Sequence, residues 1–512
     1  MPRLRIDPTS FLRGRRAYIT VAASGGALTL AFPEPDLAPL AWLALVPLLA
    51  ILGAPEPSAL AARVRRGFGL GFVFGIAFFG TLLHWITIVG YAAWVVLVVG
   101  QALFVGVFGA AVAVATARGG GAVRVLAPPL AWVGIEYLRA SFPLGGFTWG
   151  ALAQSQHDLS WLLRAAGIGG GWAVALLVVA ANALLLETWW ALRARRARGA
   201  VALFLGAVAV LSAPALLPSH SATGDAIEVA IVQGNVPEPF VGTALEKELA
   251  ILQSHRDLTR ALAPESPDLV VWPESAAGID PTTNEVAATV LADAAQAVGA
   301  PMIVGGNIDL PEERYQVMTF QVAPSGNIVD SYQKTHLVPF GEFVPARAAL
   351  DFIPMLDQIP RDAVAGREHR IFDVAGGKVA TVISFEGDFG SLVRRPISGG
   401  GRLLVVATNT STWRRSWASA QHVAFSQVRA AENGVWVVHA AISGISAFIS
   451  PAGKVVASTP LWTALPLVED VRFAQRVTFY TRTGDWLPLA ASAGALILVA
   501  AGVWRARREE SA

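Results

Sequence analysis

Three polar residues of the chain directly follow apolar runs that are typical of β-strands. Glu274 follows LVVWP, Lys334 follows NIVDSYQ, and Ser384 follows VATVI. In layered α/β folds the ends of neighbouring strands form one crevice, so residues about 50–60 apart in sequence can converge there. A carboxylate, an amine and a hydroxyl in one crevice would supply a base, an oxyanion stabiliser and a nucleophile. Each residue alone also fits a surface position or a turn.

The residue at the nucleophile position is a serine, in the stretch TVISFEGDFG (residues 381–390), and the chain contains no cysteine. The absence of cysteine excludes disulfides, thiolate metal sites and thiol catalysis. A thiol, with a pKa of about 8.5, loses its proton to a nearby carboxylate far more easily than an alcohol does. We therefore expect the serine to react orders of magnitude more slowly than a thiol would, unless the site has adapted to it.

The composition indicates a membrane protein. Of the 512 residues, 54% are hydrophobic and 15% are charged, and the mean hydropathy is +0.52, which is too apolar for an ordinary soluble chain. The net charge of +2 is too small for a nucleic-acid-binding surface. No group of residues has metal-ligand spacing, so we expect neither a metal nor a cofactor.

Eight apolar runs are near the length of about 20 residues that a spanning helix needs. They cover residues 17–32, 38–54, 67–88, 91–116, 123–139, 162–190, 199–217 and 484–504. Arginine clusters fall at every second loop or terminus, as the positive-inside rule requires: Arg13/Arg15/Arg16, Arg63/Arg65/Arg66, Arg118/Arg124, Arg193/Arg195/Arg196/Arg198 and Arg505/Arg507/Arg508. The clusters predict cytoplasmic termini and an extracytoplasmic segment between the seventh and eighth runs.

That segment, residues 220–482, has the pattern of an α/β domain. Strand-like runs such as AIEVAIVQG, DLVVW, APMIVGG, YQVMTFQV, RLLVVAT and VWVVHAA alternate with helical segments such as SAQHVAFSQVRAAENG. The stretches APSGNIV and SPAGKVV are typical of hairpin turns, which predicts a mixed sheet. We expect a membrane domain over residues 1–219, this domain over 220–482, and a last spanning helix with a cytoplasmic tail over 483–512.

Longer motifs give the chain a resemblance to a known family. VVWPESA (270–276), YQKTHLVPFGEFVP (332–345) and VISFEGDFGSLVRR (382–395), in this order, resemble the nitrilase superfamily of carbon–nitrogen hydrolases. With hydrophobic spans on both sides, the resemblance narrows to the apolipoprotein N-acyltransferases, whose membrane part is similar to WVGIEYLRASFPLGGFTWGALAQSQ (132–156). The resemblance implies a four-layer αββα domain on a bundle of about eight membrane helices.

The resemblance also implies roles for individual residues. Glu274 would be the general base, Lys334 the oxyanion stabiliser, Glu342 a support for Lys334, and Ser384 would occupy the position of a catalytic cysteine. The backbone N–H of Phe385 would be a second oxyanion donor. Glu386 is expected to be a structural acid.

Other residues are weaker candidates for substrate contact. Trp413 and Trp417 could cover the crevice, insert at the lipid interface or simply pack. Trp149 belongs to a loop that the intramembrane pair Glu136 and Arg139 would hold in place. His422 fits a structural histidine better than a ligand.

The implied activity is transfer of a fatty acyl chain from a phospholipid such as phosphatidylethanolamine to the N-terminal diacylglyceryl-cysteine of a bacterial lipoprotein. It would run through an acyl-enzyme in a ping-pong reaction. The enzyme would be a multi-pass protein of the bacterial cytoplasmic membrane with its catalytic domain on the extracytoplasmic side.

Departures from the family pattern keep alternatives open. Phe385 stands where the family has Tyr, Thr410 follows Asn409 where it has Asp, and Ser443 stands where it has Asn. Ser384 is then either natural to a divergent branch or an engineered replacement of cysteine. The alternatives to acyl transfer are an inactive homologue that binds lipid or lipoprotein, and a membrane-tethered amidase.

Overall fold

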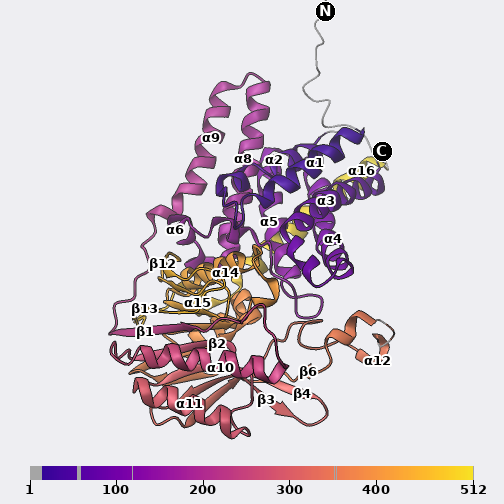
Figure 1. The fold of residues 1–512 in the computed structure, drawn as a ribbon. Coiled ribbons are helices and arrows are strands. Elements are labelled where there is room, and N and C mark those ends of the chain that lie inside the picture. Colours follow the sequence, from indigo (N-terminus) through magenta and orange to yellow (C-terminus); the bar gives the residue numbers. More distant parts are fainter. Residues whose placement is uncertain (1–13, 55–58, 118, 351, 353, 511–512) are drawn as a thin grey trace, which may run out of the picture. The chain divides into compact units, whose positions relative to one another are not determined.

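The computed structural model describes residues 14–54, 59–117, 119–350, 352 and 354–510. Arg13 and Arg118, which belong to the arginine clusters, lie outside these residues. The chain divides into two compact units, Met1–Pro218 with Asp485–Ala512, and Ser219–Gly484 (Figure 1). Each unit is described separately.

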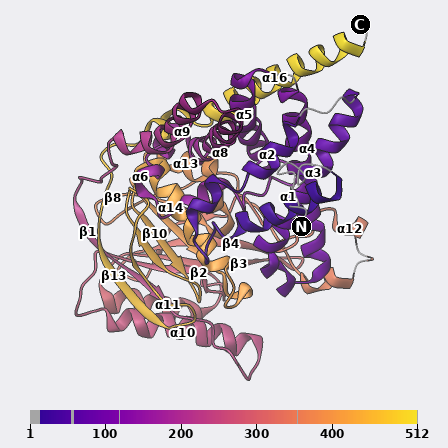
Figure 2. The ribbon, with the colours of Figure 1, turned by 90° about the horizontal axis from the view of Figure 1, so that it is seen from above.

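The first unit is helical. Its longer helices are α1 (Gly14–Thr29), α3 (Leu60–Leu82), α4 (Tyr91–Thr116), α5 (Gly121–Arg139), α8 (Gly171–Arg193), α9 (Ala197–Ser212) and α16 (Trp486–Glu510). Short helices lie between them: η2 (Ala38–Trp42), α2 (Val46–Leu52), η3 (His84–Ile88), η4 (Leu152–Gln156), α6 (Ser160–Leu163), α7 (Ala166–Gly169) and η5 (Ala213–Leu216). The C-terminal helix α16 packs against α5 and α4, so it belongs to the same bundle (Figure 2).

Four helical segments within the described residues are long and apolar enough to cross a membrane: Tyr91–Thr116, Gly171–Arg193, Ala197–Leu216 and Trp486–Arg508. The expected count of eight spans is therefore not confirmed. The run 38–54 forms η2 and the seven-residue α2 instead of one long helix. Pro39 and Pro47 stand in the first turns of these two helices, where proline fits but cannot continue a preceding helix. The run 162–190 is likewise divided among α6, α7 and α8.

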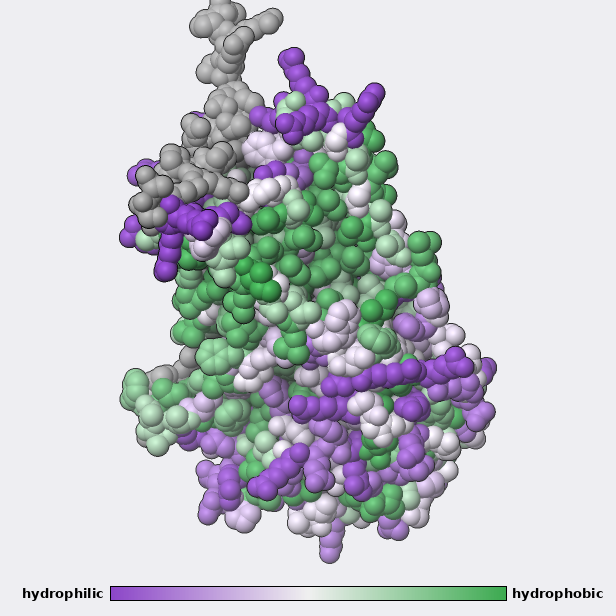
Figure 3. Space-filling view, turned by 180° about the vertical axis from the view of Figure 1, so that it is seen from behind, coloured by the Kyte–Doolittle hydropathy of each residue, from purple (hydrophilic) through white to green (hydrophobic). Residues whose placement is uncertain are grey.

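Glycines allow α3 and α4 to pack closely. A Cβ atom at Gly71 would lie 2.2 Å from the carbonyl oxygen of Val105, and one at Gly67 would lie 2.6 Å from that of Gly109. Gly67, Gly71 and Gly75 are spaced four residues apart on one helix face, the spacing that brings membrane helices into backbone contact. On the face that Figure 3 shows, much of the surface of the unit is apolar. Exposed apolar residues of the unit include Val96, Leu103, Val107, Val201, Leu205, Leu496 and Ile497.

The second unit contains two β-sheets. The first has the order β13-β1-β2-β3-β4-β5 with β6 beside β4, and the second has the order β12-β11-β10-β9-β8-β7. The first sheet is formed by β1 (Ala226–Gln233), β2 (Leu269–Ala277), β3 (Met302–Leu310), β4 (Arg314–Val322), β5 (Ile328–Gln333), β6 (Asp362–Ala363) and β13 (Leu465–Arg472). The second is formed by β7 (Ile371–Val374), β8 (Gly377–Ile383), β9 (Leu403–Thr408), β10 (Val437–Ala441), β11 (Ala447–Ile449) and β12 (Val455–Ser458).

The sheets are mixed, as predicted. In the first sheet β1, β2 and β3 are parallel, while β4 and β5 form an antiparallel hairpin at the stretch APSGNIV. In the second sheet β8, β9 and β10 are parallel, while β11 and β12 form the hairpin at SPAGKVV. The predicted helix at residues 419–434 is α14 (Ala418–Asn433), and Gly434 ends it with φ +69°, a left-handed conformation that glycine adopts without strain.

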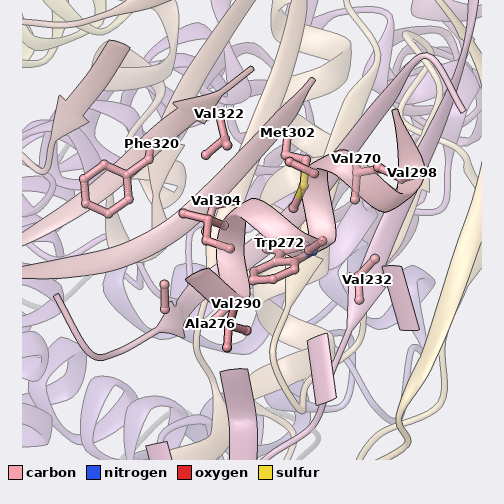
Figure 4. Packing of buried hydrophobic residues seen from close by; sticks show 14 of the residues in the cluster. Val232, Val270, Trp272, Ala276, Val290, Val298, Met302, Val304, Phe320 and Val322 are labelled. Carbon is pink, nitrogen blue, oxygen red and sulfur yellow. The ribbon is translucent and has the colours of Figure 1, made fainter. Parts of the chain in front are cut away.

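Three buried apolar clusters define four layers. One lies between the first sheet and the helices α10 (Ala244–Ala261) and α11 (Glu285–Val298), and Figure 4 shows it around Trp272, Met302 and Phe320. The second lies between the sheets and includes Val271, Ile383 and Val405. The third packs α13 (Gly390–Ser398) and α14 on the second sheet. This is the predicted αββα arrangement.

Short helical elements lie between the strands and longer helices of this unit along the chain. They are α12 (Arg347–Leu350), η6 (Pro354–Gln358), η7 (Ser384–Asp388), η8 (Ser411–Trp413) and α15 (Phe479–Thr483).

Candidate active site

The candidate site uses strands of both sheets. Glu274 lies within β2, where the pairing with β3 shifts register between Trp272 and Ala277. Lys334 directly follows β5, and both strands belong to the first sheet. Ser384 directly follows β8 of the second sheet and begins the single turn η7. The site is therefore formed between two facing sheets, whereas the sequence predicted neighbouring strand ends.

Lys334 forms the centre of the charged part of the site. Its side chain is 1% exposed, and Nζ lies 3.2 Å from Oε1 of Glu274 and 2.5 Å from Oε1 of Glu342. Glu342 also accepts a 2.7 Å hydrogen bond from the backbone N–H of Val338, through Oε2. One buried ammonium group is thus held by two carboxylates, the compensation that a buried charge requires.

The pKa shifts fit this arrangement. Burial lowers the pKa of Lys334, but Glu274 and Glu342 raise it by more, so the net pKa lies above its ordinary value and the ammonium stays charged. Burial raises the pKa of Glu274; Glu342 adds to the rise and Lys334 opposes it. A carboxylate with a raised pKa binds a proton more readily and is a better general base near neutral pH.

Glu274 connects the charged groups with Ser384. Its Oε1 accepts from Lys334, and its Oε2 accepts a 2.8 Å hydrogen bond from the backbone N–H of Asn409, the residue after Thr408, whose hydroxyl contacts Ser384. Ser384 lies close enough to Glu274 to lower the pKa of its carboxyl. Asn409 directly follows β9 of the second sheet. The three residues Glu274, Lys334 and Ser384 therefore meet in one place.

Ser384 has a strained backbone. Its φ angle is +49°, in the left-handed region that residues other than glycine rarely adopt. A strand that ends in such a residue and turns at once into a helix presents the side chain at the tip of a sharp bend, as in the nucleophile elbow of the α/β-hydrolase fold. Ser384 Oγ lies 3.1 Å from Oγ1 of Thr408, the last residue of β9.

Glu386 has the structural role that the sequence predicted. It is fully buried, and both carboxylate oxygens accept from the hydroxyl of Tyr332, at 2.8 and 2.9 Å. Oε1 also accepts from the backbone N–H of Thr335, and Oε2 from that of Ile383. Glu386 thereby fastens the segment after β5, which carries Lys334, to the segment after β8, which carries Ser384.

The expected substrate-contacting residues lie in different places. The Phe385 ring stacks on His336 and meets Phe389 edge-on, with centroids 5.6 and 4.9 Å apart. The Phe385 N–H lies in the first turn of η7, where backbone N–H groups have no acceptor within the helix. Trp413 ends η8 and is half-buried. Trp149 belongs to the helical unit, where it is buried against Trp85, so the two tryptophans are in different units.

Glu136 and Arg139 of α5 are joined to the loop of Trp149. Arg139 Nη1 donates to the backbone oxygens of Phe147, at 3.0 Å, and of Trp149, at 2.6 Å. Glu136 Oε1 accepts from the backbone N–H of Leu152 at 2.9 Å. Both residues are buried and bind this loop, in keeping with the structural role expected from the sequence.

Three groups near the site were not predicted: Thr408, which contacts Ser384, the backbone N–H of Asn409, which donates to Glu274, and Asp388, which contacts His422. His422, predicted to be structural, lies 3.3 Å from Thr408 through Nδ1 and 3.1 Å from Asp388 through Nε2. Within the described ranges, no group of three His, Cys, Asp or Glu residues could hold a metal ion.

Comparisons with known proteins cover both units. Residues 24–184 match the family described as the apolipoprotein N-acyltransferase N-terminal domain, and residues 228–475 match the carbon-nitrogen hydrolase family. The chain is 33% identical over 503 residues to an apolipoprotein N-acyltransferase of Geobacter metallireducens, with 95% of each chain covered. It is 31% identical to one of Mycolicibacterium smegmatis, with 96% of this chain and 84% of that one covered.

Among solved structures, the chain is similar to a mutant amidase of the nitrilase superfamily from Nesterenkonia AN1. The TM-score is 0.38 and the identity 17%, over 50% of this chain and 93% of the amidase. The relatives in Geobacter and Mycolicibacterium match nearly the whole chain. The chain belongs to the apolipoprotein N-acyltransferase family.

Proposed function

We propose that the protein transfers a fatty acyl chain from a membrane phospholipid to the N-terminal amine of diacylglyceryl-cysteine on bacterial lipoproteins. The observation that carries this proposal is the meeting of Glu274, Lys334 and Ser384 in a chain that also has apolar helices of membrane-spanning length. A nucleophile, a base and a buried cation are the groups that acyl transfer through a covalent intermediate requires. Membership of the family supports the acceptor and the lipid donor.

In the first half of the reaction, Ser384 Oγ attacks the ester carbonyl of the phospholipid. Glu274 serves as the general base, and Lys334 with the N–H of Phe385 stabilises the developing oxyanion. Glu342 holds Lys334 in position. The carbon–oxygen bond to the glycerol breaks, and the lysophospholipid leaves with a proton on its oxygen. The acyl chain remains as an ester on Ser384.

In the second half, the amine of the diacylglyceryl-cysteine attacks this ester. Glu274 takes a proton from the attacking nitrogen, because a neutral amide product must lose one, and Ser384 leaves with a proton. The covalent intermediate means that the two lipids need not be bound together. We assign phosphatidylethanolamine as the donor, and Trp413 and Trp149 as residues that contact lipid.

The proposal places the protein in the bacterial cytoplasmic membrane with both termini in the cytoplasm. Arg193, Arg195, Arg196 and Arg198 between α8 and α9, and Arg505, Arg507 and Arg508 at the end of α16, support this orientation. Residues 220–482 then form an extracytoplasmic domain and residues 483–512 return the chain to the cytoplasm. The outer leaflet supplies both lipid substrates.

The direct test is to express the protein in a bacterial strain depleted of its own N-acyltransferase. Mass spectrometry of lipoprotein N-termini should then show a third acyl chain, and Glu274→Gln should abolish it. Lipoproteins that remain diacylated with a free amine, although the protein is folded in the membrane, would contradict the proposal. Such a result would favour the inactive lipid-binding homologue, the alternative that the serine at position 384 raises.

A further inference from the structure

Ser384 lies at one end of a buried chain of polar side chains that the acyl-transfer chemistry above does not use. Its Oγ is 3.1 Å from Thr408 Oγ1, which is 3.3 Å from His422 Nδ1. On the other side of the imidazole, Nε2 lies 3.1 Å from Oδ1 of Asp388. Thr408, His422 and Asp388 are all buried, so this chain of contacts is shielded from solvent.

The chemistry of the three side chains fixes the direction of the hydrogen bonds. Next to the Asp388 carboxylate, Nε2 carries a proton, so Nδ1 of a neutral imidazole is an acceptor. The Thr408 hydroxyl then donates to Nδ1, and its oxygen is free to accept from Ser384. The result is a continuous path by which the Ser384 proton can move to His422.

Asp388 is suited to support a positive charge on His422. Within the part of the chain that the structure describes, neither of its carboxylate oxygens accepts a hydrogen bond, and His422 Nε2 meets Oδ1 at an ion-pair distance of 3.1 Å. An isolated buried carboxylate is costly unless a positive charge faces it. Burial raises the pKa of Asp388, while His422 and then Arg429 oppose the rise. His439, edge-on to His422 with centroids 5.0 Å apart, has a pKa lowered by burial and by His422, so it stays neutral.

We propose that Thr408, His422 and Asp388 form a proton relay that lets a serine act as the nucleophile of this site. The inference rests on the acyl transfer proposed above. In the first half-reaction His422 takes the serine proton in place of Glu274, and Glu274 remains the base that takes the proton of the attacking amine in the second. Thr408 is the member that touches the reacting oxygen; His422 and Asp388 are positioning residues that act through it.

Ser384 Oγ forms a bond to the acyl carbon while its proton moves to Thr408 Oγ1 and the Thr408 proton moves to His422 Nδ1. The imidazolium faces the Asp388 carboxylate. When the bond between the acyl carbon and the glycerol oxygen breaks, the proton returns through Thr408 to that oxygen. An alcohol needs this help because its pKa is far above that of a thiol, whereas Glu274 alone suffices to ionise a thiol.

The test compares the serine protein with the Ser384→Cys protein. In each, the rate of acylation by phosphatidylethanolamine in mixed micelles is followed by intact-protein mass spectrometry, with and without Thr408→Val or His422→Gln. We expect each substitution to slow acylation of the serine about a hundredfold, the usual size of general-base effects, and to slow acylation of the cysteine at least tenfold less. Thr408→Ser, which keeps the hydroxyl, should recover most of the loss.

Thr381→Val is the matched control. Thr381 is also a buried strand threonine, on β8, and its hydroxyl has no hydrogen-bond partner among the described residues; the acylation rate should therefore be unchanged. Melting temperatures identify variants that lose the fold. Equal losses for serine and cysteine, or a full rate in Thr408→Val, would overturn the relay. If neither the serine nor the cysteine protein is acylated at all, the proposed function fails instead, so the two failures are distinguishable.

Discussion

At the scale of single residues, the site depends on one buried ammonium group. Lys334 separates Glu274 from Glu342, which would otherwise be a buried and a partly buried carboxylate without a counter-charge. We expect Lys334→Met to lower the free energy of unfolding by about 3–5 kcal/mol, because breaking a buried pair leaves uncompensated charge. We also expect acyl transfer to fall about 100- to 1,000-fold, since an oxyanion donor is lost.

Thermal unfolding in detergent and an acyl-transfer assay measure the two effects. Lys454→Met, which changes an exposed lysine at the turn between β11 and β12, is the control and should alter neither. A Lys334→Met protein as stable as the parent would show that the two carboxylates do not depend on the ammonium group.

The second residue-scale prediction concerns pH. Glu274 acts as a base only when ionised, and burial raises its pKa. Activity should therefore be lost as the pH falls, with a midpoint above the ordinary glutamate value of about 4.3. The charge of Glu342 contributes to the rise, so the remaining activity of Glu342→Gln should have its midpoint at lower pH. Profiles of kcat/KM against pH measure both midpoints. A midpoint at the ordinary value in both proteins would contradict the assignment of Glu274.

The candidate catalytic residues could be proposed from the sequence, but the residues that surround Ser384 could not. Glu274, Lys334 and Ser384 could be predicted because each lies within or just after an apolar strand and belongs to a motif. Thr408 and His422 could not, because their contacts depend on how β9 lies beside β8 and on the rotation of α14 over the second sheet. Neither property can be read from a linear pattern.

At the scale of elements, the position of Glu274 is set by the close pairing of β2 and β3. A Cβ atom at Gly305 of β3 would lie 2.3 Å from the carbonyl oxygen of Pro273 and 2.7 Å from Cα of Glu274. Gly305→Ala should therefore displace Glu274 and lower kcat about tenfold or more, since small misplacements of catalytic groups are costly. Overpacking should also cost about 1–3 kcal/mol of stability.

A turnover assay together with a melting curve measures the Gly305→Ala effects. Gly100→Ala serves as the control, because a Cβ atom there has no neighbour within 4 Å and alanine favours a helix. If Gly305→Ala is as active as Gly100→Ala, the close pairing does not position the base.

The strands of the two sheets and their order could be predicted only in part. Alternating strands and helices predicted the layers, and the turns APSGNIV and SPAGKVV predicted the hairpins. The sequence did not predict β13, whose half-exposed run LPLVEDVR includes a proline and two acids and lies at the edge of the first sheet. Strand order across the two sheets depends on contacts between segments more than 200 residues apart, such as β1 with β13.

At the scale of the whole molecule, acyl transfer between lipids of the outer leaflet requires the α/β unit to lie outside the cytoplasm. An enzymatic reporter fused after residue 220 should be active outside the cytoplasm. If the reporter is active only outside the cytoplasm, the same reporter inserted at residue 195, in the arginine-rich connection between α8 and α9, should be inactive. Readings on the same side of the membrane for the two fusions would contradict the proposed orientation and the supply of lipid from the outer leaflet.

At this scale the expected domains, residues 1–219, 220–482 and 483–512, stay a prediction. The change from long apolar runs to short strands near residue 220 needs only composition and periodicity. The number of spans was harder to predict. Prolines and glycines interrupt the helices in apolar runs such as 38–54 and 162–190, but the runs remain apolar enough in sequence to look like single spans.

The central claim is that Ser384 carries the acyl group. The most direct measurement is intact-protein mass spectrometry after incubation of the purified protein with phosphatidylethanolamine, in the absence of acceptor. We predict a mass increase of one acyl chain, located on Ser384 by peptide mapping and absent in Ser384→Ala, and a hydroxylamine-sensitive thioester in Ser384→Cys. No acyl adduct on either the serine or the cysteine protein, with the fold intact and lipid bound, would contradict the account.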